Sequence, residues 1–131
     1  MRINRKLAAL ATGAITLASV VGLATPANAT GKNGVVESGE FGLYWLTGSS
    51  GLVFDLLLAD DNFNNDNFPG TSVPAANNTE SYRNRDTFWW HVFTGSGYTG
   101  SHGCLEPGWV GNASATYRNN IESAYFSSSS C

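Results

Sequence analysis

The sequence predicts an all-β domain, a β-sandwich assembled from two related halves. Short apolar and aromatic runs alternate with Gly, Asn, Ser and Pro along most of the chain, a spacing typical of sandwich strands. No amphipathic helical stripe persists for three turns, so we expect little helix. A two-part local pattern also occurs twice in the same order, which indicates a duplicated supersecondary unit.

The expected strands are runs of apolar and aromatic residues bounded by turn-forming residues. In chain order these runs are residues 41–46, 52–59, 87–93, 102–105 and 123–126. The best helical candidate, Leu56-Leu57-Leu58, belongs to the second run and does not stand alone. Residues 60–70 are rich in Asp and Asn, which tolerate left-handed backbone and cap their own turns, so we expect a loop there.

Residues 1–29 have the three parts of a secretory signal peptide. A basic start is followed by an apolar run over residues 7–23, and Ala27-Asn28-Ala29 supplies the small residues that signal peptidase recognises. A membrane anchor is the alternative, but the apolar run is interrupted and the cleavage site follows it directly. The sequence therefore predicts cleavage after Ala29 and a secreted, extracellular protein with no membrane segment after cleavage.

The predicted mature chain, residues 30–131, has the length of one small domain. Residues 30–40 are Gly-rich and polar, so we expect a flexible N-terminal segment; the alternative is a strand that adds to a partner's sheet edge. The domain proper comprises a first motif over about residues 41–86, a second over about 87–126 and a tail over 127–131, or 41–131 in all.

The charge of the mature chain argues against anionic partners. Four basic residues remain against ten acidic residues after cleavage, a net charge of −6. Such a surface repels nucleic acid phosphates and anionic lipids. It is compatible with cations or with basic patches on another protein.

The chain has two cysteines, Cys104 and Cys131. An even number of cysteines in an exported protein suggests a disulfide. Pairing within the chain would tie the serine-rich tail to the second motif. A dimer linked through Cys131 is the alternative.

The duplicated pattern begins with an aromatic residue and ends, seven residues later, with a glycine. Residues 44–51 read Y-W-L-T-G-S-S-G, and residues 93–100 read F-T-G-S-G-Y-T-G. A second part follows each copy, as N-N-T-E-S at residues 77–81 and N-N-I-E-S at residues 119–123. The chain thereby resembles the βγ-crystallin family, in its small secreted bacterial branch, many members of which are classed with peptidase inhibitors.

The resemblance implies a Greek-key β-sandwich with one folded hairpin in each motif. The second copy matches the family pattern fully through Phe93, Tyr98 and Gly100. The first copy has Ser49 where the family has its second aromatic. The position after the second part is Tyr82 in one copy and Ala124 in the other, where the family has Ser.

The resemblance also implies calcium binding at the second part of each motif. The residues carried over by position are Asn77, Asn78, Thr79, Ser81, Asn119, Asn120, Ile121 and Ser123. Thr79 and Ile121 would offer carbonyl oxygens, and the two serines would offer hydroxyls. Because Asn replaces Asp at every charged position, we expect weak binding at best. The alternative is that these side chains only shape turns.

Catalysis is not expected. His91 and His102 are the only histidines, and no G-x-S-x-G, H-E-x-x-H or phosphate-binding loop is present. His102 lies two residues before Cys104, but one such pair without further ligands is not a zinc pattern. An EF-hand reading of the residues from Asp60 onward fails at its sixth and twelfth positions.

We therefore expect a non-enzymatic module that binds another secreted protein. As a peptidase inhibitor it would use the loop at residues 60–70; as an adaptor it would be a subunit of a larger secreted assembly, for example an antibacterial one. The alternative is a carbohydrate or cell-wall binder with an exposed tryptophan. The candidate contact residues are Trp89, Trp90, Asn64, Asp66 and Phe68.

Overall fold

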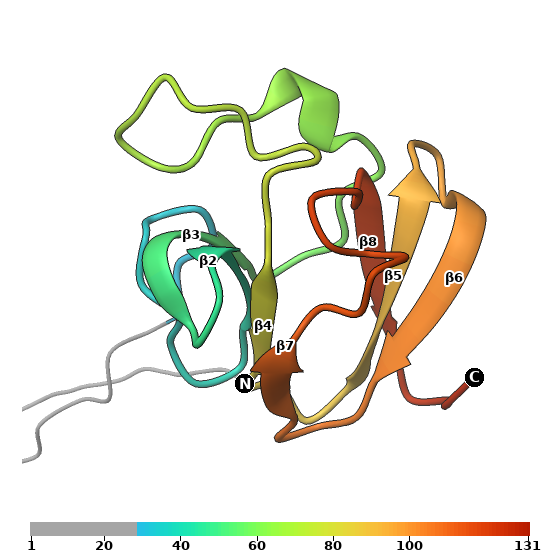
Figure 1. Cartoon of the computed structure of the whole chain (residues 1–131). Helices are drawn as coiled ribbons and strands as arrows, with labels where there is room; N and C mark the ends of the chain where they lie inside the picture. The colour runs from blue at the N-terminus through green and yellow to red at the C-terminus, as the bar shows by residue number, and fades with distance from the viewer. Residues whose placement is uncertain (1–28) are drawn as a thin grey trace, which may run out of the picture.

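The computed structural model describes residues 29–131, and the predicted signal peptide lies outside this range except for Ala29. Two antiparallel sheets form a sandwich (Figure 1). The first has the order β3-β2-β4-β7, built from β2 (Phe41–Leu46), β3 (Ser50–Leu56), β4 (Ser81–Asn84) and β7 (Val110–Asn112). The second has the order β6-β5-β8, built from β5 (Trp89–Gly95), β6 (Thr99–Leu105) and β8 (Ser123–Ser127).

The two motifs exchange their third strands. β7 follows β6 in the chain, yet it pairs with β4 of the first sheet. In the reciprocal position, Asp60 of the first motif forms an isolated bridge with Ala124 of β8 in the second sheet. This crossing makes a Greek-key sandwich, and it confirms the predicted fold class.

The core lies between the sheets and extends beneath the long loop after β3. Phe41 stacks on Trp90 across the sandwich with ring centroids 4.9 Å apart. Phe54 meets Phe63 edge-on at 5.0 Å, so the loop contributes to the same core. The loop carries the short 3₁₀ helix η2 (Phe63–Asn65) and lies above both sheets in Figure 1.

Each of the five expected runs contains a strand, but β4 and β7 were not expected. β4 reads Ser-Tyr-Arg-Asn, and its two buried residues are the polar Ser81 and Asn84. The Asn84 side chain donates to the carbonyls of Phe88 and Leu105. Burial here depends on side-chain hydrogen bonds rather than on apolar residues, so hydropathy does not detect the strand.

Residues 30–40 lie against the first sheet rather than extending away from it. The buried Asp55 carboxylate accepts hydrogen bonds from the backbone N–H groups of Asn33 and Gly34, at 2.9 and 2.6 Å. The Lys32 N–H also donates to the Asp55 carbonyl. We expected a flexible segment on composition. The segment is instead held by hydrogen bonds to Asp55 and by two further bonds, from the Gly39 N–H to the Arg85 carbonyl and from the Arg85 side chain to the Val36 carbonyl. Within residues 29–131, no helix has the length and apolar character to span a bilayer.

Candidate functional site

The duplicated pattern forms two equivalent folded hairpins. Ser49 and Tyr98 occupy the same left-handed position, with φ of 55° and 60°. The backbone N–H of Ser49 donates to Ser81 Oγ, and that of Tyr98 donates to Ser123 Oγ. Each serine in turn donates to a carbonyl at the end of the hairpin's first strand, Leu46 or Gly95, at 2.6 Å. Both serines therefore hold their hairpins closed.

The two Asn-rich segments lie side by side and bond reciprocally. The Asn77 N–H donates to the Ile121 carbonyl at 3.0 Å, and the Asn119 N–H donates to the Thr79 carbonyl at 2.8 Å. Both asparagines have left-handed backbone, with φ of 60° and 55°. The structure thus brings these four predicted calcium residues together as two related half-sites, one from each motif.

Asn78 and Asn120 do not join these half-sites. The Asn78 side chain donates to the Pro74 carbonyl, and the Asn120 side chain donates to the Thr116 carbonyl, in both cases four residues earlier. These contacts cap local turns, as Asn commonly does. For this pair the structure favours the turn-shaping alternative over a role as calcium ligands.

Two glutamates, which the sequence offers as compensating charges beside the predicted ligands, lie in the half-sites. Glu122 accepts hydrogen bonds from the side chains of Asn77 and Asn64, at 2.9 and 3.1 Å. These bonds, from Asn77 first, lower the pKa of Glu122 below its usual value. Glu80 instead accepts from the Asn119 side chain and pairs with Arg118 at 3.2 Å. Only the Glu80 carboxylate therefore has a cationic partner.

The Glu122 half-site fits calcium better than the Glu80 half-site does. Within residues 29–131, Asn77 Oδ1 is buried beside Glu122 without a hydrogen-bond partner, and Thr79 Oγ1 is in the same state in the other half-site. What separates the two half-sites is that Glu80 already pairs with Arg118. An unpartnered oxygen of this kind, one carboxylate and the Ile121 carbonyl are ligand types that calcium accepts. One carboxylate is a low charge for a calcium site, so the residues present suit weak binding.

The loop at residues 60–70 is exposed at its tip and buried at its base. Phe63 and Phe68 are completely buried, whereas Asn64, Asn65 and Asn67 are exposed. Phe68 was a candidate partner contact; it faces the core and cannot touch a partner of the folded domain. The prediction for Phe68 is therefore wrong, because its aromatic ring is needed beneath the loop.

Lys32 forms ion pairs with two aspartates of the loop, one at its start and one six residues later. Its ammonium group lies 2.6 Å from Asp60 and 3.1 Å from Asp66. Burial disfavours the charge of Asp60, but the hydrogen bonds from Lys32, the Asn62 N–H and Asp66, with the Lys32 charge, together lower the pKa of that carboxyl. Burial and the neighbouring Asp60 carboxyl raise the pKa of Asp66. The candidate contact residue Asp66 is thus half-buried and paired with Lys32, while Asn64 stays accessible.

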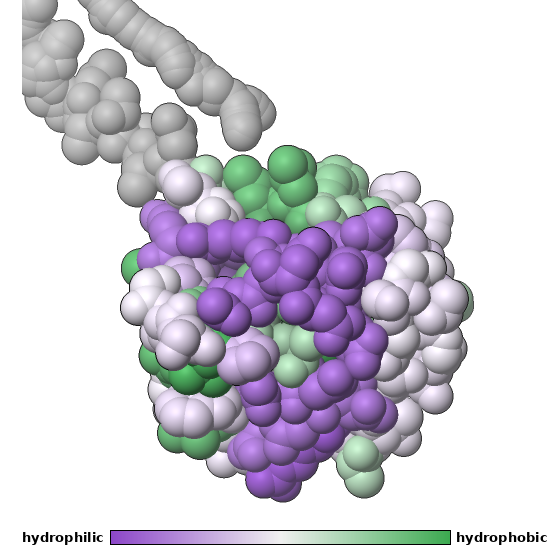
Figure 2. Space-filling model, turned by 90° about the horizontal axis from the view of Figure 1, so that it is seen from above, coloured by the Kyte–Doolittle hydropathy of each residue, from purple (hydrophilic) through white to green (hydrophobic). Residues whose placement is uncertain are grey.

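An open, acidic groove lies beside this loop. Its volume is about 730 Å³, and its lining includes Lys32, Asp60, Asp61, Asp66 and Tyr98. Figure 2 looks down on the loop side of the molecule and shows a broad band of hydrophilic residues across it. The groove and the loop tip together form a polar, mainly acidic surface, which we call the loop face.

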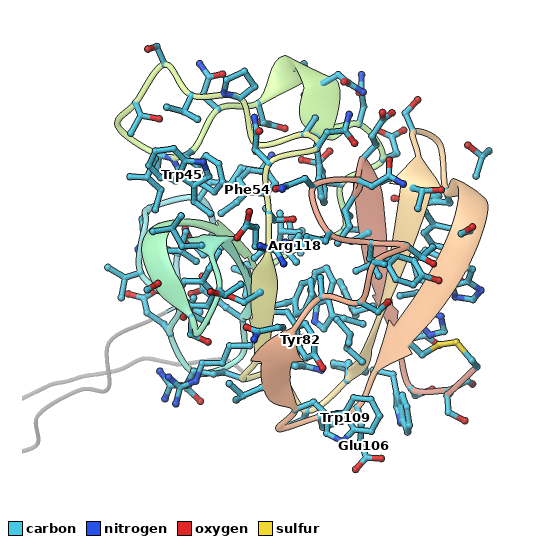
Figure 3. The ribbon with its side chains drawn as sticks, in the orientation of Figure 1. Trp45, Phe54, Tyr82, Glu106, Trp109 and Arg118 are labelled. Carbon is cyan, nitrogen blue, oxygen red and sulfur yellow. A yellow bond between two sulfur atoms is a disulfide. The ribbon has the colours of Figure 1, made fainter. Side chains whose placement is uncertain are left out.

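The tryptophan prediction is wrong for Trp90. Trp90 is completely buried, and its indole N–H donates to Asp86 at 2.9 Å. Trp89 points to the other side of β5 and is half-buried. The exposed tryptophans are instead Trp45 and Trp109, at 40% and 46% exposure. Figure 3 places them at different ends of the molecule, so they form no common aromatic surface.

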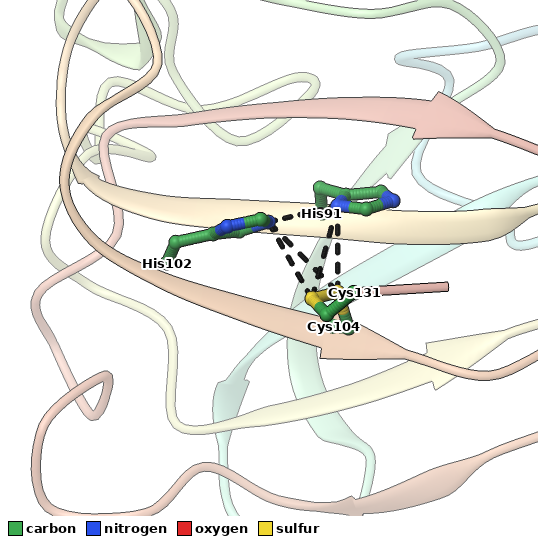
Figure 4. Close-up of side chains that lie close together, drawn as sticks. All are labelled: His91, His102, Cys104 and Cys131. Carbon is green, nitrogen blue, oxygen red and sulfur yellow. Dashed lines mark hydrogen bonds between the residues drawn. A yellow bond between two sulfur atoms is a disulfide. The ribbon is translucent and has the colours of Figure 1, made fainter. Parts of the chain in front are cut away.

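A cluster that the sequence reasoning set aside lies on the outer face of the second sheet. His91, His102, Cys104 and Cys131 place their potential ligand atoms within 4.8 Å of one another (Figure 4). The structure pairs the two cysteines in a disulfide within the chain. In the sequence, only the spacing of His102 and Cys104 hinted at this cluster. His91 lies 11 residues before His102, and Cys131 lies 27 residues after Cys104.

Comparisons with solved structures support the fold. The chain is similar to the structure "Evolution of the eye lens beta-gamma-crystallin domain fold", with a TM-score of 0.58 and 15% identity over 69% of this chain and 86% of that one. It is also similar to "Crystal structure of N-terminal domain of protein S", with a TM-score of 0.53 and 14% identity over 70% and 99%. At this identity the likeness shows the fold alone.

Comparison of sequences assigns the family. No curated protein matches the chain. The sequence profile of peptidase inhibitor family I36 matches residues 29–105, which is more than half of the chain and includes the loop face and the first motif. With its βγ-crystallin fold, the chain belongs to peptidase inhibitor family I36.

Proposed function

We propose that this chain is a secreted, non-enzymatic inhibitor that binds a peptidase through its loop face. Membership of a peptidase inhibitor family supports a peptidase as the partner. We choose this surface because of how the loop at residues 60–70 is held. Its tip is accessible, and its base is held by two buried phenylalanines.

A loop held in this way loses little conformational freedom on binding, which favours tight inhibition. The backbone N–H of Asp60 donates to the Ala124 carbonyl, and that of Phe63 donates to the Glu122 carbonyl. The Gly97 N–H donates to the Asp61 carbonyl. The loop is therefore tied to the second motif as well as to the first.

The charge of the loop face suggests the chemistry of the partner. Three aspartates and a single lysine line the groove. We expect a peptidase with basic residues around its active site, because complementary charge accelerates association.

To test this proposal, the mature chain (residues 30–131) is added to purified secreted peptidases of the serine, cysteine, aspartic and metallo classes, and their activity is measured. We expect stoichiometric inhibition of at least one enzyme. Asp61→Lys should reduce the association rate about tenfold or more at low salt. Asp61 is exposed, and its side chain faces the groove.

The matched control is Glu106→Lys, which makes the same charge change. Glu106 is exposed and lies at the far end from the loop in Figure 3. Its replacement should leave inhibition unchanged. Failure to inhibit any class would refute the inhibitor proposal, and equal losses in the two variants would refute the loop face.

Weak calcium binding at the Glu122 half-site is a second candidate property. The buried, unpartnered Asn77 Oδ1 beside the Glu122 carboxylate favours it. A calcium concentration of ten times Kd should stabilise the folded state by about 1.4 kcal/mol, since only the folded state presents the site.

Thermal unfolding with chelator and with millimolar calcium checks this expectation. Glu122→Gln should abolish the calcium-dependent rise in Tm. Glu80→Gln should retain it, because Glu80 already pairs with Arg118. An unchanged wild-type Tm in calcium would eliminate the site.

Two other functions have less support. An adaptor role would be indicated by larger secreted proteins that co-purify stoichiometrically with the tagged chain. A carbohydrate or cell-wall binder would now have to use Trp45 or Trp109, because Trp90 is buried. Loss of glycan-array signal on replacing either one with Ala would favour that alternative.

A further inference from the structure

Strand register brings two histidines and a cysteine to one face of the second sheet. His91 of β5 lies directly opposite Cys104 of β6, and Phe93 lies opposite His102. His102 and Cys104 are two residues apart on β6, so both side chains project from the same face. Cys131 reaches this face from the tail beyond β8 and is bonded to Cys104 (Figure 4).

The distances within this cluster resemble the edges of a zinc tetrahedron. Cys104 Sγ lies 3.4 Å from His91 Nδ1 and 3.8 Å from His102 Nε2. Cys131 Sγ lies 4.0 and 3.6 Å from the same two nitrogens. Tetrahedral zinc with ordinary bond lengths separates sulfur from nitrogen by about 3.5 Å and nitrogen from nitrogen by about 3.4 Å. The two nitrogens here are 2.8 Å apart, so they need separate only slightly.

The ring of His91 is oriented as that of a metal ligand usually is. Its Nε2 lies 3.0 Å from the Ser129 carbonyl, which can only accept, so Nε2 carries the proton. Nδ1 therefore presents its lone pair to the cluster and accepts a hydrogen bond from His102 Nε2–H, 2.8 Å away. Zinc would take the place of that proton, with the N–H of the neutral His102 ring moving to its Nδ1. A ligating histidine commonly donates its other N–H to a backbone carbonyl in this way.

Aromatic neighbours hold both imidazole rings. Tyr125 stacks on His91 at 4.7 Å, and Phe93 stacks on His102 at 4.5 Å. The two imidazole ligands are thus largely ordered before any metal binds.

We propose that His91, His102, Cys104 and Cys131 form a tetrahedral zinc site in the reduced chain. A dithiol or phosphine reductant supplies two electrons to the Cys104–Cys131 disulfide and is itself oxidised, leaving two thiols. Zinc then binds both sulfurs as thiolates and the two neutral imidazoles, with release of two protons. The sulfur atoms must move apart to about 3.8 Å, the separation in a tetrahedral site.

The zinc site and the disulfide exclude each other but close the same loop. Either one ties residues 128–131 to the outer face of the second sheet. Zinc also occupies both thiolates, so it should slow their oxidation. The tail can thus be fastened under reducing as well as oxidising conditions.

The experiment compares reduced and oxidised chains of residues 30–131 under anaerobic conditions. Cobalt(II) is the spectroscopic probe, and zinc affinity is measured by displacement of cobalt. The reduced chain should bind one cobalt with the visible bands of a tetrahedral thiolate site. Zinc should displace it with Kd of about 10⁻⁷ M or tighter, as in other four-ligand sites. The oxidised chain should bind at least a hundredfold more weakly.

Two reduced variants and a control test the ligand assignment. His102→Gln and Cys131→Ser should each weaken binding about a hundredfold or more, since each removes one of the four ligands. Asp61→Asn, a carboxylate outside the cluster, should bind zinc like the unchanged chain. If the reduced chain unfolds without metal, added zinc should restore its circular dichroism. Octahedral cobalt spectra, or equal affinity in reduced, oxidised and variant chains, would overturn the proposal.

Discussion

Glu40 is a buried carboxylate where the N-terminal segment meets the first sheet. Its Oε2 accepts the Glu37 N–H at 2.6 Å, but its Oε1 has no hydrogen-bond partner. Burial raises the pKa of Glu40, and the charges of Asp55 and Glu37 add to the rise. The folded state therefore favours the protonated form of this side chain.

Glu40→Gln should stabilise the protein at neutral pH. Because the pKa of Glu40 is higher in the folded state, its contribution to stability is complete below the ordinary value of 4.5 and is lost as pH rises through the raised pKa. Gln stays neutral throughout, so the variant should melt at a higher temperature than the wild type at pH 7 and at the same temperature at pH 4. Thermal unfolding across this range measures the effect, with the exposed Glu106→Gln as control.

A Tm of Glu40→Gln at or below that of the wild type at pH 7 would contradict this account.

The sequence alone placed one of Trp89 and Trp90 in the core but could not say which. Side chains alternate between the two faces of a strand, but this alternation does not show which face is buried. Packing of Trp90 on Phe41 decides it.

The segment at residues 30–40 is attached to strand β3. Asp55 is buried within the strand and accepts two backbone N–H groups from this segment. Bonds from N–H groups to a carboxylate are stronger than those between neutral groups. The Asp55 carboxylate therefore anchors the turn at residues 33–34 to β3.

Asp55→Ala should release the turn at residues 33–34 while leaving the second sheet intact. The amides of Asn33 and Gly34 should exchange with solvent at near-unprotected rates, and those of β5 should keep their protection. Global stability should fall by about 1–3 kcal/mol, the cost of losing bonds to a charged group. Hydrogen exchange read by NMR measures both. Asp61→Ala, an exposed carboxylate, should change neither, and retained protection at Asn33 would contradict the assignment.

On the scale of the whole molecule, the disulfide joins β6 to the tail across 27 residues. In the chain-entropy model, closing a loop of 27 residues contributes about 3.5 kcal/mol. This is a large part of the stability of a small domain, which is generally about 5–15 kcal/mol.

Replacing both cysteines with serine should lower Tm by roughly 15–25 °C, because the unfolded chain gains the freedom that the crosslink removes. Circular dichroism during heating, with a chelator present, provides the measurement. The reduced wild type under the same conditions is the control and should melt at a similar temperature. A decrease of less than about 5 °C would show that other contacts hold the tail.

The local features of this protein follow from its sequence. Apolar runs identified five of the seven strands within residues 29–131, and the repeated hairpin pattern indicated two related halves. The pairing of Cys104 with Cys131 was one of two alternatives, and the structure confirms it. These features depend on spacing along the chain, which sequence records directly.

Other features arise only from contacts between distant residues. β4 and β7 have no apolar signal, because buried polar side chains and pairing with another motif define them. Phe68 looked like part of an exposed loop, but it lies in the core. The His91, His102, Cys104 and Cys131 cluster forms because strand register and the tail bring four positions together. Such proximity is a property of the folded chain, since no local pattern encodes which distant segments will meet.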